Sequence, residues 1–233
     1  TVGMSLLVTL ACALLGFPVA YYMARYTSGK TRALFYVGIM LPLWSSYLVR
    51  VYAWKLILAK EGIIGWAAEG TGTSFLIDGL LSIPGLEGSS LSTSPFGTFL
   101  VFVYIWLPYM ILPMQAALER VPVSMLEASA DLGATRAQTF RTVILPLALP
   151  GVIAGAILCF AKAMGEFGAT ITFVSNIPGE TQTLPSMIYT LTQIPGGDAG
   201  ALRLTLISIA ISMLALLGSE LLARRIGARG MTT

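Results

Sequence analysis

The apolar positions of this chain gather into five long runs separated by polar connections. The runs are Val2–Met23, Leu34–Leu58, Phe96–Leu118, Leu147–Phe173 and Leu202–Leu222. A helix needs about 20 predominantly apolar residues to cross the hydrocarbon core of a bilayer, and each run is long enough. The pattern predicts an all-α integral membrane protein with at least five transmembrane helices, in one membrane domain over residues 1–233. We expect the second run to be embedded only to about Val49.

Composition supports a membrane protein. The 233 residues are 56% hydrophobic and 11% charged, with a mean hydropathy of +0.81, whereas a soluble domain carries about 25% charged residues. The net charge is only +3 and the basic residues lie in separate connections, so nucleic acid is not an expected partner. Cys12 and Cys159 lie in apolar runs without metal-ligand spacing, and there is no histidine, so no metal site is predicted. The N-terminal run lacks a basic lead and a cleavage site, which indicates a spanning helix.

The positions of lysine and arginine predict the orientation in the membrane, because cytoplasmic connections carry an excess of them. Nine of the fourteen lie in the first connection, the third connection and the C-terminal tail: Arg25, Lys30, Arg32, Arg120, Arg136, Arg141, Arg224, Arg225 and Arg229. The other connections hold six acidic residues against Lys60 and Arg203. We therefore expect the first and third connections and the C-terminus to be cytoplasmic. Thr1 would then lie outside, and we expect a further helix to precede it.

The polar stretch over residues 122–146 has the signals of two short helices. Ser124-x-x-Glu127 matches a capping box, and Gly133 fits the left-handed position that closes a helix. Thr135-x-x-Gln138 is a second capping box, which opens a helix running toward Pro146. Two short helices that meet at a glycine form a shape that a partner could grip. The alternative is an amphipathic hairpin with only a packing role.

The two remaining connections are expected on the outside. Lys60–Pro95 contains a short apolar piece, Gly62–Ala68, predicted as a helix at the membrane interface, and an irregular remainder. It could cover the outer mouth and meet a soluble partner, or be an ordinary solvated connection. In Val174–Gly200, the segment Thr183–Tyr189 is predicted as a short re-entrant or interfacial helix. Non-helical backbone at membrane depth needs protein or a wet cavity beside it, so this segment is a candidate for lining the outer vestibule.

The predicted spans contain a few charged and hydroxyl residues. Lys162 and Glu166 are four apart, so on one helix they would share a face and could pair, which lowers the cost of charge in the bilayer. Either this face lines a substrate path or the pair is structural. The candidates for the path are Lys162, Glu166, Thr170, Thr172 and Arg50.

The polar stretch also carries a family resemblance. Glu127-Ala128-Ser129, then Gly133, then Ile144-Leu145-Pro146 resembles the EAA loop of permease subunits in binding-protein-dependent ABC importers. Ser129 stands in place of the second alanine of that pattern, and Leu145-Pro146 follow Ile144 directly. The resemblance implies a cytoplasmic coupling helix that docks on an ATPase. Its residues would be Glu127, Ala128, Ser129, Asp131, Leu132, Gly133, Ala134 and Arg136.

The same resemblance implies the partners and the location. They are a cytoplasmic ABC ATPase dimer, a periplasmic or lipid-anchored substrate-binding protein, and a second copy or a homologue of this permease, in the inner membrane of a bacterium or archaeon. ATP and Mg²⁺ would be bound by the ATPase, with no cofactor on this chain. The chain has no Gly-x-x-x-x-Gly-Lys-[Ser/Thr] phosphate loop, so we expect a non-catalytic subunit.

Two parts of the chain resemble permeases for different substrates. Residues 165–200 look like molybdate permeases and, more loosely, sulfate permeases, whereas residues 41–54 are more similar to spermidine/putrescine permeases. We expect a path for a tetrahedral oxyanion, with molybdate favoured because the later match is longer. A polyamine importer is the alternative. An alternative of another class is an ion-coupled secondary transporter that uses Lys162 and Glu166 as its coupling pair.

Overall fold

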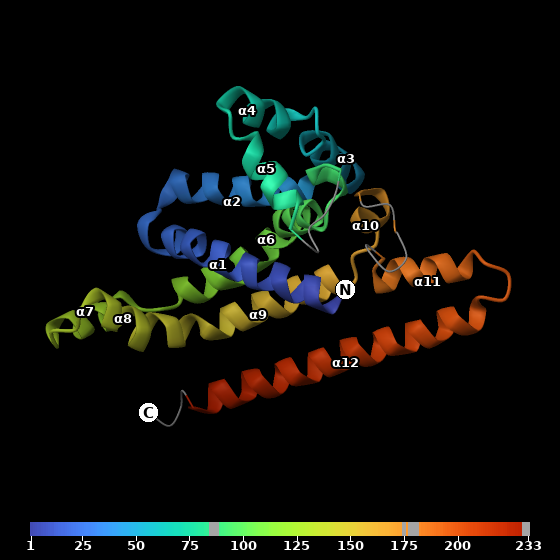
Figure 1. The fold of residues 1–233 in the computed structure, drawn as a ribbon. Helices are drawn as coiled ribbons and strands as arrows, with labels where there is room; N and C mark the ends of the chain where they lie inside the picture. The colour runs from blue at the N-terminus through green and yellow to red at the C-terminus, as the bar shows by residue number, and fades with distance from the viewer. Residues whose placement is uncertain (84–88, 174–175, 177–181, 230–233) are drawn as a thin grey trace. The chain divides into compact units, whose positions relative to one another are not determined.

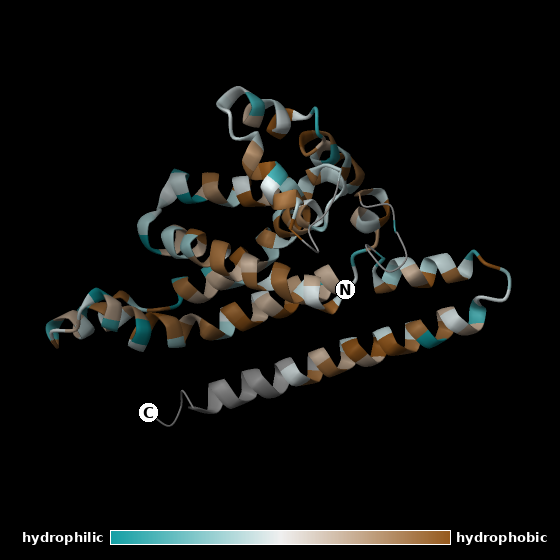
Figure 2. Ribbon diagram, viewed as in Figure 1, coloured by the Kyte–Doolittle hydropathy of each residue, from teal (hydrophilic) through white to brown (hydrophobic). Residues whose placement is uncertain are grey.

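The computed structural model describes residues 1–83, 89–173, 176 and 182–229, and every regular element within these ranges is a helix (Figure 1). Among the described residues, four helices are long and apolar enough to cross a membrane: α1 (Val2–Tyr26), α6 (Pro95–Glu119), the continuous stretch Arg136–Met164 that ends in α9 (Leu145–Met164), and α12 (Asp198–Arg229). Apolar residues predominate along α1, α9 and the first part of α12 (Figure 2). The all-α membrane prediction is confirmed.

The predicted run Leu34–Leu58 is a broken span. It consists of α2 (Gly29–Trp44) and α3 (Tyr47–Ile57), which are bent by 95° and make a fifth span if counted together. Ser45 Oγ donates to the carbonyl of Pro42 (3.1 Å), and Ser46 is extended with ψ 132°. Serine hydroxyls that bond to nearby backbone compete with helix continuation, which is a physical reason for a break at this point. Hydropathy alone does not detect such a break.

The predicted run Leu147–Phe173 is also interrupted. α9 ends at Met164, and a six-residue helix, α10 (Gly168–Phe173), follows. Between them Glu166 Oε1 accepts the backbone N–H of Ala169 (2.9 Å), as an N-cap residue does. Glu166 therefore lies outside α9, and the assumption that it shares one helical face with Lys162 is wrong.

The connections contain more helix than predicted. The apolar piece around Trp66 forms α4 (Ile63–Thr71), which ends at left-handed Gly72, as expected for a helix there. The prediction that the remainder of this connection is irregular is partly wrong, because α5 (Ser74–Leu81) and the 3-10 turn η1 (Leu91–Thr93) form in it. Residues 84–88 of this connection lie outside the described ranges. α11 (Leu184–Thr192) confirms the short helix in the later connection, of which residues 174–175 and 177–181 are not described.

The contacts of the chain divide it into two compact units. One consists of Thr1–Val8, Leu41–Ile105 and Lys162–Ile209, and the other of Thr9–Met40, Trp106–Ala161 and Ala210–Thr233. The first unit holds α3, α4, α5, α10 and α11, and the second holds the polar stretch. The long helices α1, α6, α9 and α12 contribute residues to both.

In the second unit, small residues let α9 approach α6 closely. A Cβ on Gly151 would lie 2.5 Å from the carbonyl oxygen of Pro113 and 2.4 Å from the Cβ of Ala117. A Cβ on Gly155 would lie 2.9 Å from the sulfur of Met110. Membrane helices use small residues in this way, because close backbone approach supplies the packing that the hydrophobic effect does not supply between helices in lipid.

Candidate functional site

The polar stretch begins with α7 (Val123–Asp131), which starts two residues earlier than a cap at Ser124 predicts. Its N-cap is Pro122 at φ −65° and ψ 140°, and no side chain caps it. Ser124 is therefore inside the helix and does not form the predicted capping box with Glu127. The fixed φ of proline already suits a helix entry, and this local geometry decides the boundary.

α7 ends at Gly133 in the predicted left-handed conformation, with φ 76°. The N–H of Ala134 donates to the carbonyl of Ser129 (3.0 Å), and the N–H of Gly133 donates to that of Ala130 (2.8 Å). These are the two bonds of a Schellman motif, which satisfies carbonyls that the helix end leaves open. A Cβ on Gly133 would meet no atom within 4 Å, so backbone conformation alone favours glycine here.

The second short helix is α8 (Arg136–Thr139), followed by a π-helical turn, η2 (Phe140–Ile144). The predicted Thr135–Gln138 capping box is confirmed: Gln138 N–H donates to Thr135 Oγ1 (3.3 Å), and Thr135 N–H donates to Gln138 Oε1 (2.8 Å). Ser129 and Thr139 share a hydrogen bond between their hydroxyls (2.8 Å), which joins α7 to α8. The serine that replaces the second alanine of the EAA pattern thus closes the hairpin that α7 and α8 form (Figure 1).

The surface of this hairpin has apolar side chains that the chain itself leaves open. Leu132 is 89% exposed, Val123 61% and Met125 48%. The other residues named for coupling lie around them: Glu127, Ala128, Asp131 and Arg136 are exposed, and Ser129 and Ala134 are half-buried. An apolar surface bordered by charged residues is typical of a protein-binding site.

A second polar cluster lies where the two helix breaks meet in the first unit. Tyr47, the first residue of α3, donates its hydroxyl hydrogen bond to Glu166 Oε1, and Glu166 is only 6% exposed. At the other end of α3, Lys55 Nζ donates to the carbonyl oxygen of Thr172 (2.9 Å). A Cβ on Gly168 would lie 2.8 Å from Cε1 of Tyr47. α3 and α10 are therefore joined along their length, in close contact.

Arg50 lies one turn after Tyr47 on α3. Its guanidinium carbon is 5.8 Å from the centre of the Tyr47 ring, within the range of a cation–π interaction. Its Nε and Nη1 atoms are buried, and neither has a hydrogen-bond partner in the part of the chain that the structure describes. Buried donors are normally satisfied, so the two unpartnered nitrogens of Arg50 are candidates for bonding a ligand, an ion or water.

Among the other residues predicted to line the path, the two threonines donate hydrogen bonds to backbone carbonyls four residues earlier. Thr172 Oγ1 donates to the carbonyl of Gly168 (2.6 Å), and Thr170 Oγ1 donates to that of Glu166 (3.4 Å). Lys162 is exposed in the last turn of α9. The structure thus brings Arg50, Glu166 and Thr172 to one α3–α10 contact. Tyr47 and Lys55 were not among the residues predicted for this site, although the i, i+3 spacing of Tyr47 and Arg50 was a usable signal.

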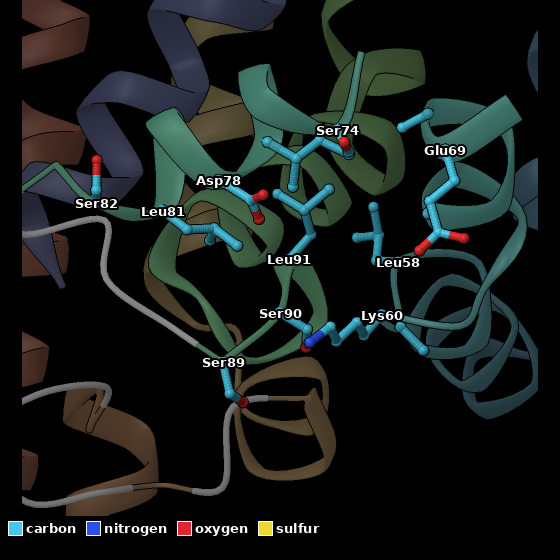
Figure 3. Close-up of a pocket in the computed structure, with 14 residues that line it drawn as sticks. Leu58, Lys60, Glu69, Ser74, Asp78, Leu81, Ser82, Ser89, Ser90 and Leu91 are labelled. Atoms are coloured by element: carbon cyan, nitrogen blue, oxygen red, sulfur yellow. The ribbon is translucent and has the colours of Figure 1, made fainter. Parts of the chain in front are cut away.

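A pocket of about 450 Å³ lies among α4, α5, η1 and the turn after α3 (Figure 3). Its charged lining residues are Lys60, Glu69 and Asp78, which come from three different segments, and its lining includes four serines. In the described residues, no group of three or more acidic or cysteine side chains is arranged to hold a metal ion.

Comparison with known proteins gives the family. Residues 16–228 match the family described as "Binding-protein-dependent transport system inner membrane component". The chain belongs to this family. A bacterial ABC transporter structure, described as involved in the import of the acidic polysaccharide alginate, has the same fold with a TM-score of 0.68, at 18% identity over 97% of this chain and 78% of that one.

Three relatives are ABC transporter or transport-system permeases, and the names of two of them state different substrates. The chain is 49% identical to the inner membrane ABC transporter permease protein YdcU of Escherichia coli K12, over 91% of this chain and 66% of that protein. It is 53% identical to the molybdenum transport permease ModB of the same organism, over 59% and 60%, respectively. It is 30% identical to its spermidine/putrescine permease PotB, over 97% and 78%. The chain thus spans two thirds or less of the lengths of YdcU and ModB.

Proposed function

We propose that the chain is the transmembrane subunit of an ATP-driven importer and forms the path of a tetrahedral oxyanion, with molybdate as the favoured substrate. The geometry that carries the importer proposal is the α7–α8 hairpin, whose bend at Gly133 presents exposed Leu132, Val123 and Met125. The family match over residues 16–228 supports it.

In this proposal the hairpin inserts into a cytoplasmic ATPase, which binds ATP and Mg²⁺. Two ATPase subunits that close on ATP would draw together the hairpins of two permease chains, and hydrolysis would let them separate. Such a rigid-body change provides alternating access. The α4–α5 segment with its pocket lies on the predicted outer side, where a periplasmic or lipid-anchored binding protein would deliver the substrate.

Arg50 supports an oxyanion as the substrate. Its guanidinium has buried donors without a partner among the described residues, and arginine suits the oxygens of a tetrahedral anion because it is planar and always charged. The 53% identity to ModB over 137 residues agrees with this choice.

A polyamine is the second candidate, because PotB is similar over nearly the whole chain. A polyamine path would need carboxylates and aromatic faces. Glu166 and Tyr47 offer both, but they are already bonded to each other, and Glu166 also accepts the N–H of Ala169. These contacts make Glu166 less available to a cation than Arg50 is to an anion.

The test is ATP hydrolysis by the complex reconstituted in proteoliposomes with its ATPase and binding protein. Molybdate or tungstate should stimulate hydrolysis, whereas spermidine and putrescine should not. Stimulation by a polyamine alone would overturn the oxyanion in favour of the second candidate. Failure of the chain to co-purify with any ATPase would overturn the importer itself.

A matched pair of variants tests the role of Arg50. Arg50→Gln should lower the oxyanion stimulation about 10- to 100-fold, since a hydrogen bond to a charged group contributes about 1.5–3 kcal/mol. Arg203→Gln is the control, because it removes an exposed positive charge from the start of α12. If molybdate stimulated ATP hydrolysis equally in both variants, Arg50 would not be part of the substrate path.

A further inference from the structure

The turn between α1 and α2 is fastened to the residues that lead into α7. Arg32 Nη1 forms an ion pair with Glu119 Oε1 (2.7 Å) at the last residue of α6. Arg25 Nη2 donates to the carbonyl oxygen of Val121 (3.1 Å), the residue before the N-cap of α7. All four residues belong to the second unit. Two arginines, one at the end of α1 and one in the first turns of α2, therefore bond to both ends of the short link between α6 and α7.

The turn between these two arginines is itself held by hydrogen bonds. Arg32 Nε and Nη2 donate to the carbonyl of Thr27 (3.2 and 2.9 Å), and Thr27 Oγ1 donates to the carbonyl of Met23 (2.6 Å). Thr27 is only 4% exposed. The guanidinium of Arg32 thus joins the end of α1, the start of α2 and the end of α6, so these three helix ends cannot shift separately without breaking it.

A second contact joins α2 to α6 about one turn further along each helix. Tyr36 donates its hydroxyl hydrogen bond to Gln115 Oε1 (2.5 Å), and Gln115 is 1% exposed. α2 and α6 are therefore joined by two polar contacts one helical turn apart, and the Arg32–Glu119 pair is the one nearer to α7. Val121, two residues after Glu119, is bonded instead to Arg25 of α1, so a movement of α7 acts on α1 through Arg25 and on α2 through Glu119 and Arg32.

The size of these interactions indicates a role other than stability. The Arg32–Glu119 pair is 36% and 31% exposed, and such pairs contribute about 0–1 kcal/mol to folding. Removing it should leave the fold intact. Coupling between sites is carried by just this kind of contiguous polar network, provided that it links elements that move.

We propose that Arg25 and Arg32 are positioning residues that transmit the displacement of α7 to the α1–α2 hairpin. The inference rests on the proposed function, in which an ATPase moves α7. With the arginines in place, α1, α2 and α6 follow α7 together. Without them, α7 stays connected to α6 by the covalent link and to α9 by the π-helical turn, in which Phe140 contacts Phe17 and Tyr21 of α1.

The experiment measures substrate transported per ATP hydrolysed by the reconstituted complex. Arg32→Gln, Glu119→Gln and Arg25→Gln should each still assemble with the ATPase and hydrolyse ATP, while transport per ATP falls about five-fold or more. Lys30→Gln is the matched control, because it removes an exposed positive charge from the same turn and should change nothing. The reversed pair, Arg32→Glu with Glu119→Arg, should recover part of the transport that Arg32→Glu loses.

Two outcomes would overturn the inference. One is a wild-type ratio of transport to hydrolysis in all three variants. The other is a fall that matches lost assembly, with no recovery by the reversed pair, since this would show a purely structural role. If Arg32→Gln fails to fold, Arg32→Lys takes its place. Lysine keeps the positive charge opposite Glu119 but cannot make the two hydrogen bonds to the carbonyl of Thr27, so the ratio of transport to hydrolysis should be intermediate. A wild-type complex that holds no ATPase would instead refute the proposed function.

Discussion

Replacing Gly133 with valine tests whether the bend between α7 and α8 is what the ATPase recognises. Gly133 has φ 76°, and a left-handed conformation costs a residue with a Cβ about 1–2 kcal/mol, with β-branched residues the least tolerant. No atom lies within 4 Å of the position where a Cβ would be, so no steric clash adds to this cost. A penalty of that size lowers the weight of the bent conformation relative to others by about 5- to 30-fold.

The assay is titration of the purified ATPase onto membranes that contain the variant, together with transport and the amount of permease in the membrane. Gly133→Val should reach the membrane in normal amount, but weaken ATPase binding by up to the same factor. Gly133→Asn should lose less, because asparagine tolerates the left-handed region better. Gly196→Val is the matched control: it has φ 79° and equally open surroundings, but it lies between α11 and α12.

Two results would refute this reasoning. Normal ATPase binding and normal transport in Gly133→Val would show that the bend is not required for docking. An equal loss of ATPase binding in Gly196→Val would show that the defect arises from general destabilisation and not from the hairpin.

Two further predictions concern orientation and the contact between the helix breaks. In intact cells, a cysteine at Ser28 should be shielded from an impermeant thiol reagent, and a cysteine at Ser89 should be labelled. Background labelling should be low, because both native cysteines are buried. The reverse pattern would show that the predicted topology is inverted. Tyr47→Phe should cost about 1–3 kcal/mol of stability, measured by thermal unfolding of the purified permease, because the buried Glu166 side chain loses a hydrogen bond. Combining it with Glu166→Gln should cost less than the sum of the two, and Tyr52→Phe, an exposed tyrosine of the same helix, should cost little; additive losses would show that the two residues act separately.

Features that depend on short stretches of chain could be predicted. Each membrane helix satisfies its own backbone hydrogen bonds, so apolar length alone locates α1 and α6 to within a few residues. It also finds α12, although that helix extends beyond the predicted run at both ends. The left-handed Gly133 and the Thr135–Gln138 cap were also predictable, because only neighbouring residues take part in them. The cap at Ser124 failed for a reason of the same local kind, since Pro122 had already set the entry into α7.

The amino-acid sequence by itself therefore determined that this protein is a helical membrane permease with a bent polar hairpin. The tertiary structure alone decided which residues meet at its helix breaks. Tyr47 bonds to Glu166 across 119 residues, and Arg25 bonds to Val121 across 96. No periodic pattern in the sequence indicates either pairing. Several acceptors could satisfy each donor, and packing decides which of them lies within hydrogen-bonding distance. For this reason the partner expected for Glu166 was Lys162, four residues away, whereas the structure brings Tyr47 to it from the other broken span.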